Sequence, residues 1–288
     1  MAARRVGTEP LAGGFVKVFP PTCYRCPFGK EYPSCDVTCA TLIEDVIKLE
    51  GPETVAAIMV EPIGHTGGVI DPPDEYLPIL REICDRHDVL LIFDEIITGI
   101  GRTGEMFAAD TFGVVPDMLC VGKALASGYA LIMAVLMRQP VAEAFWGDPK
   151  ENPGLVSGHT QEGNPTACAA ALATLAEIEE RDLCANARRV GERLRQGLEG
   201  LCRHGIIGDI RGKGLFYGIE FVKDLETKEK FTEAVGTRIG KRALELGMLI
   251  RYDQHWIAIG PPLIITDDHA DEIVAILDQS IADVVAAF

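Results

Sequence analysis

Short apolar runs alternate with amphipathic segments along the first half of the chain. The apolar runs predict strands at residues 55–60, 89–93, 118–122 and 131–137. The amphipathic segments predict helices at residues 39–50, at residues 72–87 and around residue 107. Continuous apolar strands separated by helices are typical of a mostly parallel sheet with helices on both faces. The expected fold class is therefore α/β.

Two long helices follow, predicted at residues 165–181 and 183–204. Beyond them the predicted elements are shorter and lie at residues 210–222, 231–246, 248–252 and 256–259, with a last helix from residue 267. We therefore expect a large domain over residues 1–205 and a small C-terminal α+β domain over residues 206–288. Residues 1–35 are rich in Pro, Gly and Cys without clear periodicity, and are expected to form an extended arm.

Composition narrows the class of protein without naming an activity. With 288 residues, 48% hydrophobic and 24% charged, the chain is long enough for one large domain or for a large and a small one. Its net charge of −16 disfavours binding to nucleic acid or to an anionic membrane surface. No apolar stretch is long enough to span a bilayer, and the first residues lack the apolar core of a signal peptide, so we expect a cytoplasmic protein.

The nine cysteines fall into two groups. Five stand singly within apolar helix or strand patterns, as expected of reduced core thiols. The other four form the pairs Cys23-x-x-Cys26 and Cys35-x-x-x-Cys39, a spacing that suits tetrahedral zinc. Because the second pair is not a tight knuckle and Cys39 opens a predicted helix, we expect reduced loop thiols and no metal. A zinc-binding loop is the alternative.

A lysine and a carboxylate each follow a predicted strand. Lys123 comes directly after residues 118–122, and Asp94 directly after residues 89–93. Parallel strands end at one rim of their sheet, where ligands bind. A lysine amine can form a Schiff base with an aldehyde cofactor, and an aspartate can keep a pyridine nitrogen protonated. Taken singly, Lys123 is more readily a solvated lysine at a strand end, and Asp94 a helix-capping or turn carboxylate. Together they suggest pyridoxal phosphate chemistry, with Lys123 in an apolar pocket.

Several ordered stretches carry a family resemblance. They are Val-Glu-Pro-Ile at 60–63, Pro-Pro-Asp-Glu-Tyr at 72–76, Leu-Ile-Phe-Asp-Glu-Ile at 91–96, Thr-Gly-Ile-Gly-Arg-Thr-Gly at 98–104, the segment 116–123, Gly-His-Thr-Gln-Glu-Gly-Asn-Pro at 158–165 and Pro-Pro-Leu at 261–263. In this order they resemble the class III aminotransferases, the fold-type I pyridoxal phosphate enzymes that include ornithine, 4-aminobutyrate and other ω-amino acid aminotransferases. The resemblance implies a transaminase that exchanges an amino group between an amine or amino acid and a keto acid.

The resemblance also implies roles for individual residues. Lys123 would bind pyridoxal phosphate as a Schiff base and move the proton, while Asp94 would pair with the pyridine nitrogen. Ile96 would pack under the cofactor ring. Thr160 would reach the cofactor phosphate of a neighbouring subunit, which implies a homodimer. Glu61, another carboxylate near this rim, either joins the cofactor shell or bonds to neighbouring backbone.

Two departures from the family pattern bear on activity and substrate. Nothing in the chain resembles the family's glycine-serine phosphate loop or the aromatic residue that stacks on the ring, so the sheet is expected to be incomplete. The chain is then either a truncated aminotransferase or a short form that replaces those donors.

Thr66 and Ala258 stand where the ornithine branch has a glutamate and an arginine, so an ω-amino acid or simple amine donor is expected, with a keto acid such as pyruvate as acceptor.

Three questions stay open at the level of sequence. Arg251 either binds a substrate carboxylate or forms a structural ion pair. The lysine chemistry would also suit a decarboxylase, a racemase or an aldolase. A catalytically silent fragment that keeps the fold and a dimer surface is the further alternative.

Overall fold

The sheet of the N-terminal half has four strands. The computed structural model describes residues 6–148, 150–151 and 154–288. The strands are β1 (Ala57–Val60), β2 (Leu90–Asp94), β3 (Met118–Val121) and β4 (Ala134–Met137), in that spatial order. β1, β2 and β3 are parallel, and β4 runs antiparallel to β3. A mostly parallel sheet interleaved with helices confirms the predicted α/β class.

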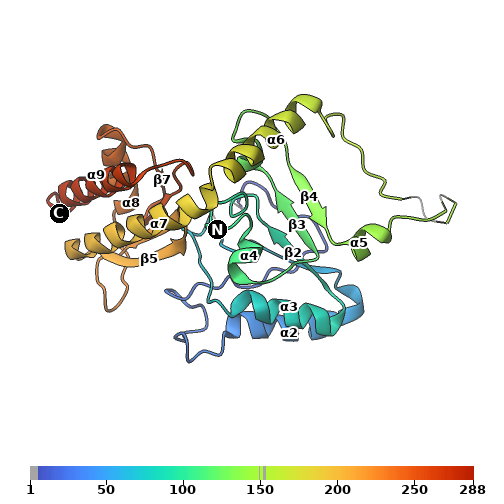
Figure 1. The fold of residues 1–288 in the computed structure, drawn as a ribbon. Helices are drawn as coiled ribbons and strands as arrows, with labels where there is room; N and C mark the ends of the chain where they lie inside the picture. The colour runs from blue at the N-terminus through green and yellow to red at the C-terminus, as the bar shows by residue number, and fades with distance from the viewer. Residues whose placement is uncertain (1–5, 149, 152–153) are drawn as a thin grey trace.

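Helices cover both faces of this sheet, as Figure 1 shows. α2 (Thr38–Glu50) and α3 (Tyr76–His87) lie on one side, and α6 (Pro165–Glu180) lies on the other. The fully buried side chains of Leu91 and Phe93 in β2 pack in one core with those of Leu77 and Leu80 in α3. The shorter elements of this half are η1 (Pro52–Thr54), α4 (Ala108–Phe112), η2 (Lys123–Ala126) and α5 (Gln139–Glu143).

Two element boundaries differ from the prediction for backbone reasons. β1 begins at residue 57 instead of 55, because Pro52–Thr54 forms a 3-10 turn and the Val55 amide donates to the Pro52 carbonyl. α3 begins at Tyr76 instead of residue 72. A residue that precedes a proline is disfavoured in the helical region, and this applies both to Asp71 and to Pro72. The described part of the predicted arm, residues 6–35, contains no helix or strand.

The C-terminal half forms a second sheet that is antiparallel throughout. Its strands are β5 (Ile207–Lys213), β6 (Phe216–Phe221), β7 (Arg251–Tyr252) and β8 (Trp256–Ile259), in the order β5-β6-β8-β7. The predicted stretch 210–222 is thus a hairpin that turns at residues 214–215. Its helices are α7 (Leu183–Gly200), η3 (Leu201–His204), α8 (Val235–Glu245) and α9 (Asp267–Val285). α8 starts four residues later than predicted, and β7 is shorter than predicted.

The two halves have separate hydrophobic cores. The first contains the β2 and α3 side chains named above, together with Leu183 at the start of α7. The second begins at Ala187 in the same helix and continues through β6 and α9. The division of the chain at residue 205 stays a prediction. In the part of the chain that the structure describes, no helix combines the length and apolarity needed to cross a bilayer.

Candidate active site

Three charged residues follow the parallel strands at one edge of the first sheet. Val60 pairs with Phe93, and Asp94 pairs with Cys120. Glu61 comes directly after β1, Asp94 ends β2, and Lys123 comes two residues after the end of β3. Parallel strands place their carboxyl ends together, which is where ligands bind in such sheets. The sheet therefore brings Glu61, Asp94 and Lys123 to one edge.

Lys123 begins the 3-10 turn η2 with an unusual backbone. Its φ is 44°, in the left-handed region that a lysine seldom adopts. Such strain is common at functional sites. The side chain is exposed, so the expectation of an apolar pocket around it is wrong for this chain. Leu131 and Met133, on the segment leading into β4, are exposed as well, at 100% and 68%.

Asp94 is half-buried and has a defined partner. Its Oδ1 accepts a hydrogen bond from the Ile96 amide at 3.2 Å. Ile96 in turn lies next to the strand that leads to Lys123, since a Cβ built on Gly122 would be 3.7 Å from Ile96 Cγ2. The apolar Ile96 side chain therefore lies beside the residue before the lysine, and Asp94 pairs with Cys120, two residues earlier in the chain.

Glu61 is electrostatically linked to the other two charged groups. Burial raises its pKa, Asp94 raises this pKa further by repulsion, and Lys123 opposes the rise by attraction. Its Oε2 also accepts a hydrogen bond from the His65 amide at 3.2 Å. Glu61 thus belongs to the same cluster of charges as the lysine and the aspartate.

Glu95 has a structural role that sequence reasoning did not resolve. Its buried carboxylate accepts from the amides of Ala108 at 2.6 Å and Ala109 at 2.8 Å, and from the Thr98 hydroxyl at 3.2 Å. Burial raises its pKa, and these hydrogen bonds act against the rise. Glu95 therefore satisfies the first amides of α4 and fixes the loop that follows Asp94. The sequence marks this region only as a short helix around residue 107.

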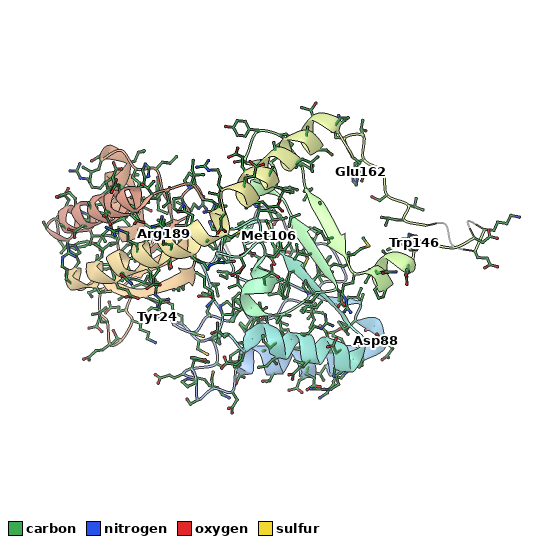
Figure 2. The ribbon with its side chains drawn as sticks, viewed as in Figure 1. Tyr24, Asp88, Met106, Trp146, Glu162 and Arg189 are labelled. Carbon is green, nitrogen blue, oxygen red and sulfur yellow. The ribbon has the colours of Figure 1, made fainter. Side chains whose placement is uncertain are left out.

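Thr160 and Arg251 lie on other parts of the molecule. Thr160 is exposed on residues 154–164, the stretch that leads into α6, which runs outside the body of the protein in Figure 1. Glu162, two residues further on, marks this segment in Figure 2. Arg251 is exposed on β7, the edge strand of the C-terminal sheet. The structure does not bring either residue into the Lys123 cluster, and their predicted roles stay predictions.

The four loop cysteines surround one small cavity of about 20 Å³. Burial and the neighbouring thiols raise the pKa of Cys23, and they raise that of Cys39 to about 11. Within the described ranges, no group of three or more Cys, His, Asp or Glu side chains is arranged to hold a metal ion. The four thiols of the proposed zinc loop therefore lie around one cavity, but among the described residues they do not form a metal-ligand arrangement.

A larger cavity of about 830 Å³ lies away from the Lys123 edge. It is lined by the arm around Tyr24, by the turn that contains Thr66 and by the C-terminal sheet around Trp256. Ala258 is buried beside Phe216, close to the same turn. Neither Lys123 nor Asp94 is among its described lining residues, so the chemistry of the strand edge is not inside this cavity.

The strand edge fits the groups that pyridoxal phosphate needs along its ring. It has one amine with a carboxylate beside it, an apolar side chain and a second carboxylate within electrostatic reach. The described residues at this edge do not show the phosphate donors.

The chain is similar to known proteins over nearly its whole length. Residues 6–281 match the family Aminotransferase class-III. The chain is 40% identical to taurine–pyruvate aminotransferase of Bilophila wadsworthia over 99% of its own length, and spans 64% of that relative. It is 41% identical to leucine/methionine racemase of Thermococcus litoralis over 92% of its own length and 58% of that relative.

Solved structures give the same result for the fold. The omega transaminase of Pseudomonas jessenii in complex with PMP has a TM-score of 0.95 and 35% identity, covering 99% of this chain and 64% of that one. The neighbours are fold-type I transaminases, as the sequence resemblance implied. The family match extends over nearly the whole chain, and Glu61, Asp94 and Lys123 lie together at one edge of its parallel sheet. The chain therefore belongs to the class III aminotransferase family.

Proposed function

We propose that the protein transfers an amino group between an amine or ω-amino acid and a keto acid, with pyridoxal phosphate as its cofactor. The observation that carries this proposal is the cluster of Glu61, Asp94 and Lys123 at one edge of the sheet. Class III aminotransferases depend on pyridoxal phosphate. Because the chain spans 64% of the first relative's length, activity of this chain by itself is part of the proposal.

The cofactor, when bound, supplies an electron sink for the bond that breaks at the substrate carbon. In our proposal the chain's own residues do the rest. Lys123 Nζ attaches the cofactor and then carries the proton to and from the substrate. Asp94 holds its negative charge against the ring nitrogen, and the Ile96 amide fixes the direction of that carboxylate. Ile96 packs against the ring.

Glu61 forms the outer part of this site. Burial raises its pKa, which favours the protonated form of this carboxyl group. We propose that it faces the cofactor beside Asp94 and limits the total negative charge there. Thr160 is proposed to serve the cofactor phosphate of a second subunit in a homodimer. Its position on a segment that leaves the body of its own chain supports that assignment.

The substrate proposal rests on relatives and on two replaced residues. Taurine–pyruvate aminotransferase, by its name, acts on an ω-amino sulfonate and a keto acid. Thr66 and Ala258 replace the charged pair of the ornithine branch, so a short amine or ω-amino acid donor with a pyruvate-like acceptor fits best. Arg251 is proposed to bind a substrate carboxylate. We propose the cytoplasm as the compartment.

A racemase is the second candidate, since the chain is 41% identical to leucine/methionine racemase. The two functions use the same lysine and differ in product. A transaminase converts a keto acid to an amino acid at the expense of the amine, whereas a racemase inverts one amino acid without a keto acid.

Reduction with borohydride tests the shared chemistry. The purified protein is mixed with pyridoxal phosphate, reduced and digested, and we expect the modified peptide to contain Lys123. The variant Lys123→Ala is the matched control and should carry no label there. Assays with taurine plus pyruvate, and with L-leucine alone, then separate the two functions. An unlabelled Lys123 in the wild-type chain would support a silent fragment.

A further inference from the structure

Glycine-rich turns come shortly after both carboxylates of the site. The turn 64–68 follows Glu61, and the loop 98–104 follows Asp94. Both press against the C-terminal domain with little space between the backbones. A Cβ on Gly218 would lie 2.4 Å from the Gly68 carbonyl oxygen, and one on Gly214 would lie 2.6 Å from the Arg102 carbonyl oxygen.

An arginine ties the loop after Asp94 to two separate points of the C-terminal domain. Arg102 Nη1 donates to the Leu215 carbonyl at 3.2 Å, in the β5–β6 turn, and to the Pro261 carbonyl after β8. The backbone of Arg102 is engaged as well, because its carbonyl accepts from the Leu215 amide at 3.1 Å. One residue therefore spans partners that are 113 and 159 positions away in sequence.

The buried environment of Arg102 disfavours the positive charge of its guanidinium group. Burial alone lowers its pKa to about 10, with no carboxylate contributing. A guanidinium held by carbonyl dipoles without a counter-ion is unusual in a protein interior. Its Nη1 alone donates to both carbonyls, and a guanidinium is more weakly hydrated than an ammonium, which favours an arginine over a lysine at a buried position. The contacts therefore explain why an arginine occupies this position.

The turn after Glu61 is anchored by an arginine of the C-terminal half, whereas Arg102 belongs to the N-terminal half. Arg211, in β5 of the C-terminal domain, donates through Nε to the carbonyls of Gly68 and Val69, each at 2.9 Å. Here the arginine comes from the C-terminal domain and the acceptors come from the N-terminal half. The two turns are thus fastened to the same C-terminal sheet by two reciprocal arginines.

We propose that Arg102 is a positioning residue of the active site, which holds Asp94 and Ile96 in place beside Lys123 by anchoring their loop to the C-terminal domain. Arg211 does the same for Glu61. The part of this inference that concerns the reaction rests on the proposed function. The anchoring itself does not, and is measurable in the chain without cofactor.

Hydrogen exchange measured by mass spectrometry tests the anchoring. In Arg102→Met, amides of residues 94–104 should exchange at least about tenfold faster than in the wild type, because the loop loses its side-chain anchor. Peptides from α9 should be unchanged. Arg102→Lys should fall between the two, and it remains usable if the methionine variant does not fold. Arg193→Met removes an exposed arginine paired with Asp271 on the C-terminal domain and is the matched control.

Measurements on the cofactor-loaded protein then distinguish a positioning role of Arg102 from a purely structural one. In Arg102→Met, the pH at which the absorbance of bound cofactor changes should shift by about half a pH unit or more, because Asp94 moves relative to the ring. For the amine donor, kcat should fall roughly tenfold with KM within about threefold. A folded Arg102→Met chain whose 94–104 amides exchange at the wild-type rate would overturn the proposal. Failure of the proposed function would instead appear as absent Lys123 labelling in the wild type.

Discussion

The two sheets of the molecule differ in how well they are covered. Every residue of β6, in the middle of the C-terminal sheet, is buried. In the N-terminal sheet, three of the four residues of the edge strand β4 are exposed, and Met59 of the opposite edge strand β1 is 57% exposed. Yet the residues proposed for catalysis lie on the N-terminal sheet. We therefore expect the better-covered sheet to contribute more to stability, while the less covered one holds the residues proposed for the chemistry.

This division also explains the exposure of Lys123. The C-terminal sheet has α7, α8 and α9 packed in one core with it. The lysine instead follows β3, next to the exposed β4. A reactive amine in such a place depends on its immediate neighbours for orientation. Substitutions in the two sheets should therefore have opposite signatures, one in activity and the other in stability.

Replacement of Asp94 should give the largest effect on activity and a small effect on stability. In Asp94→Ala the proposed partner of the ring nitrogen is lost, and we expect amine-dependent turnover to fall by roughly 100-fold to 1,000-fold. The side chain is only half-buried, so the free energy of unfolding should change by less than about 1 kcal/mol. Steady-state kinetics and urea denaturation measure both. Asp85→Ala, at an exposed carboxylate of α3, is the control, and equal activity in the two variants would contradict the site.

Truncation of the C-terminal core should show the reverse pattern. Ile219 in β6 is fully buried, so Ile219→Ala should lower the free energy of unfolding by about 2–5 kcal/mol. Leu136→Ala in β4, where the side chain is 44% exposed, should cost less than about 1 kcal/mol. Chemical denaturation of the two variants makes the comparison direct. Similar losses at both positions would remove the proposed contrast between the sheets.

Asp71 offers a pH-dependent test at the boundary of the two halves. Burial raises its pKa from 3.8 to about 6, and its Oδ1 has no hydrogen-bond partner in the structure. As pH rises from about 4 to about 6, the unfolded chain releases this proton first, so Asp71 lowers stability above that window. Asp71→Asn should therefore be more stable than the wild type at pH 7 by up to about 3 kcal/mol.

The same variant should match the wild type near pH 2.5, which lies well below both pKa values, so that the folded and unfolded states both hold the proton. Thermal unfolding at the two pH values is the measurement. Asp74→Asn changes an 82% exposed carboxylate near the same Lys213 and should shift stability by less than about 0.5 kcal/mol at either pH. A pH-independent effect of Asp71→Asn would show that its burial is not the cause.

The exposed edge strand should affect association more weakly. Val135 in β4 is 51% exposed, and a lysine at a strand edge opposes pairing with a second chain. Val135→Lys should reduce self-association several-fold at micromolar concentration, with little change in unfolding. Sedimentation velocity measures it. Leu225→Lys, at a 50% exposed loop position of the C-terminal half, is the control, and an equal effect of both changes would point to net charge alone.

Sequence periodicity located the elements well where local pattern determines them. The strands that carry Glu61, Asp94 and Lys123 were predictable because continuous apolar runs mark buried strands, and parallel strands share one carboxyl edge. The class III resemblance was confirmed by the family match and by the solved structures. The roles of the individual site residues stay predictions.

Features that depend on distant contacts were not predictable. The role of Arg102 depends on hydrogen bonds to carbonyls more than 100 positions away in sequence, and no local pattern predicts these bonds. The exposure of Lys123 depends on what covers β4, and the gathering of four cysteines around one cavity depends on the path of an irregular loop. Propensity and periodicity describe neighbours along the chain, whereas these features arise from neighbours in space.

The helix α7 connects the two hydrophobic cores. α6 and α7 are joined only by Arg181 and Asp182, and Asp182 has a left-handed φ of 47°. Leu183 packs in the first core, and Ala187 and later residues of α7 pack in the second, so this joint lies close to the boundary of the two cores. An 18-residue helix is roughly 27 Å long, so a rotation of about 5° displaces its far end by roughly 2 Å.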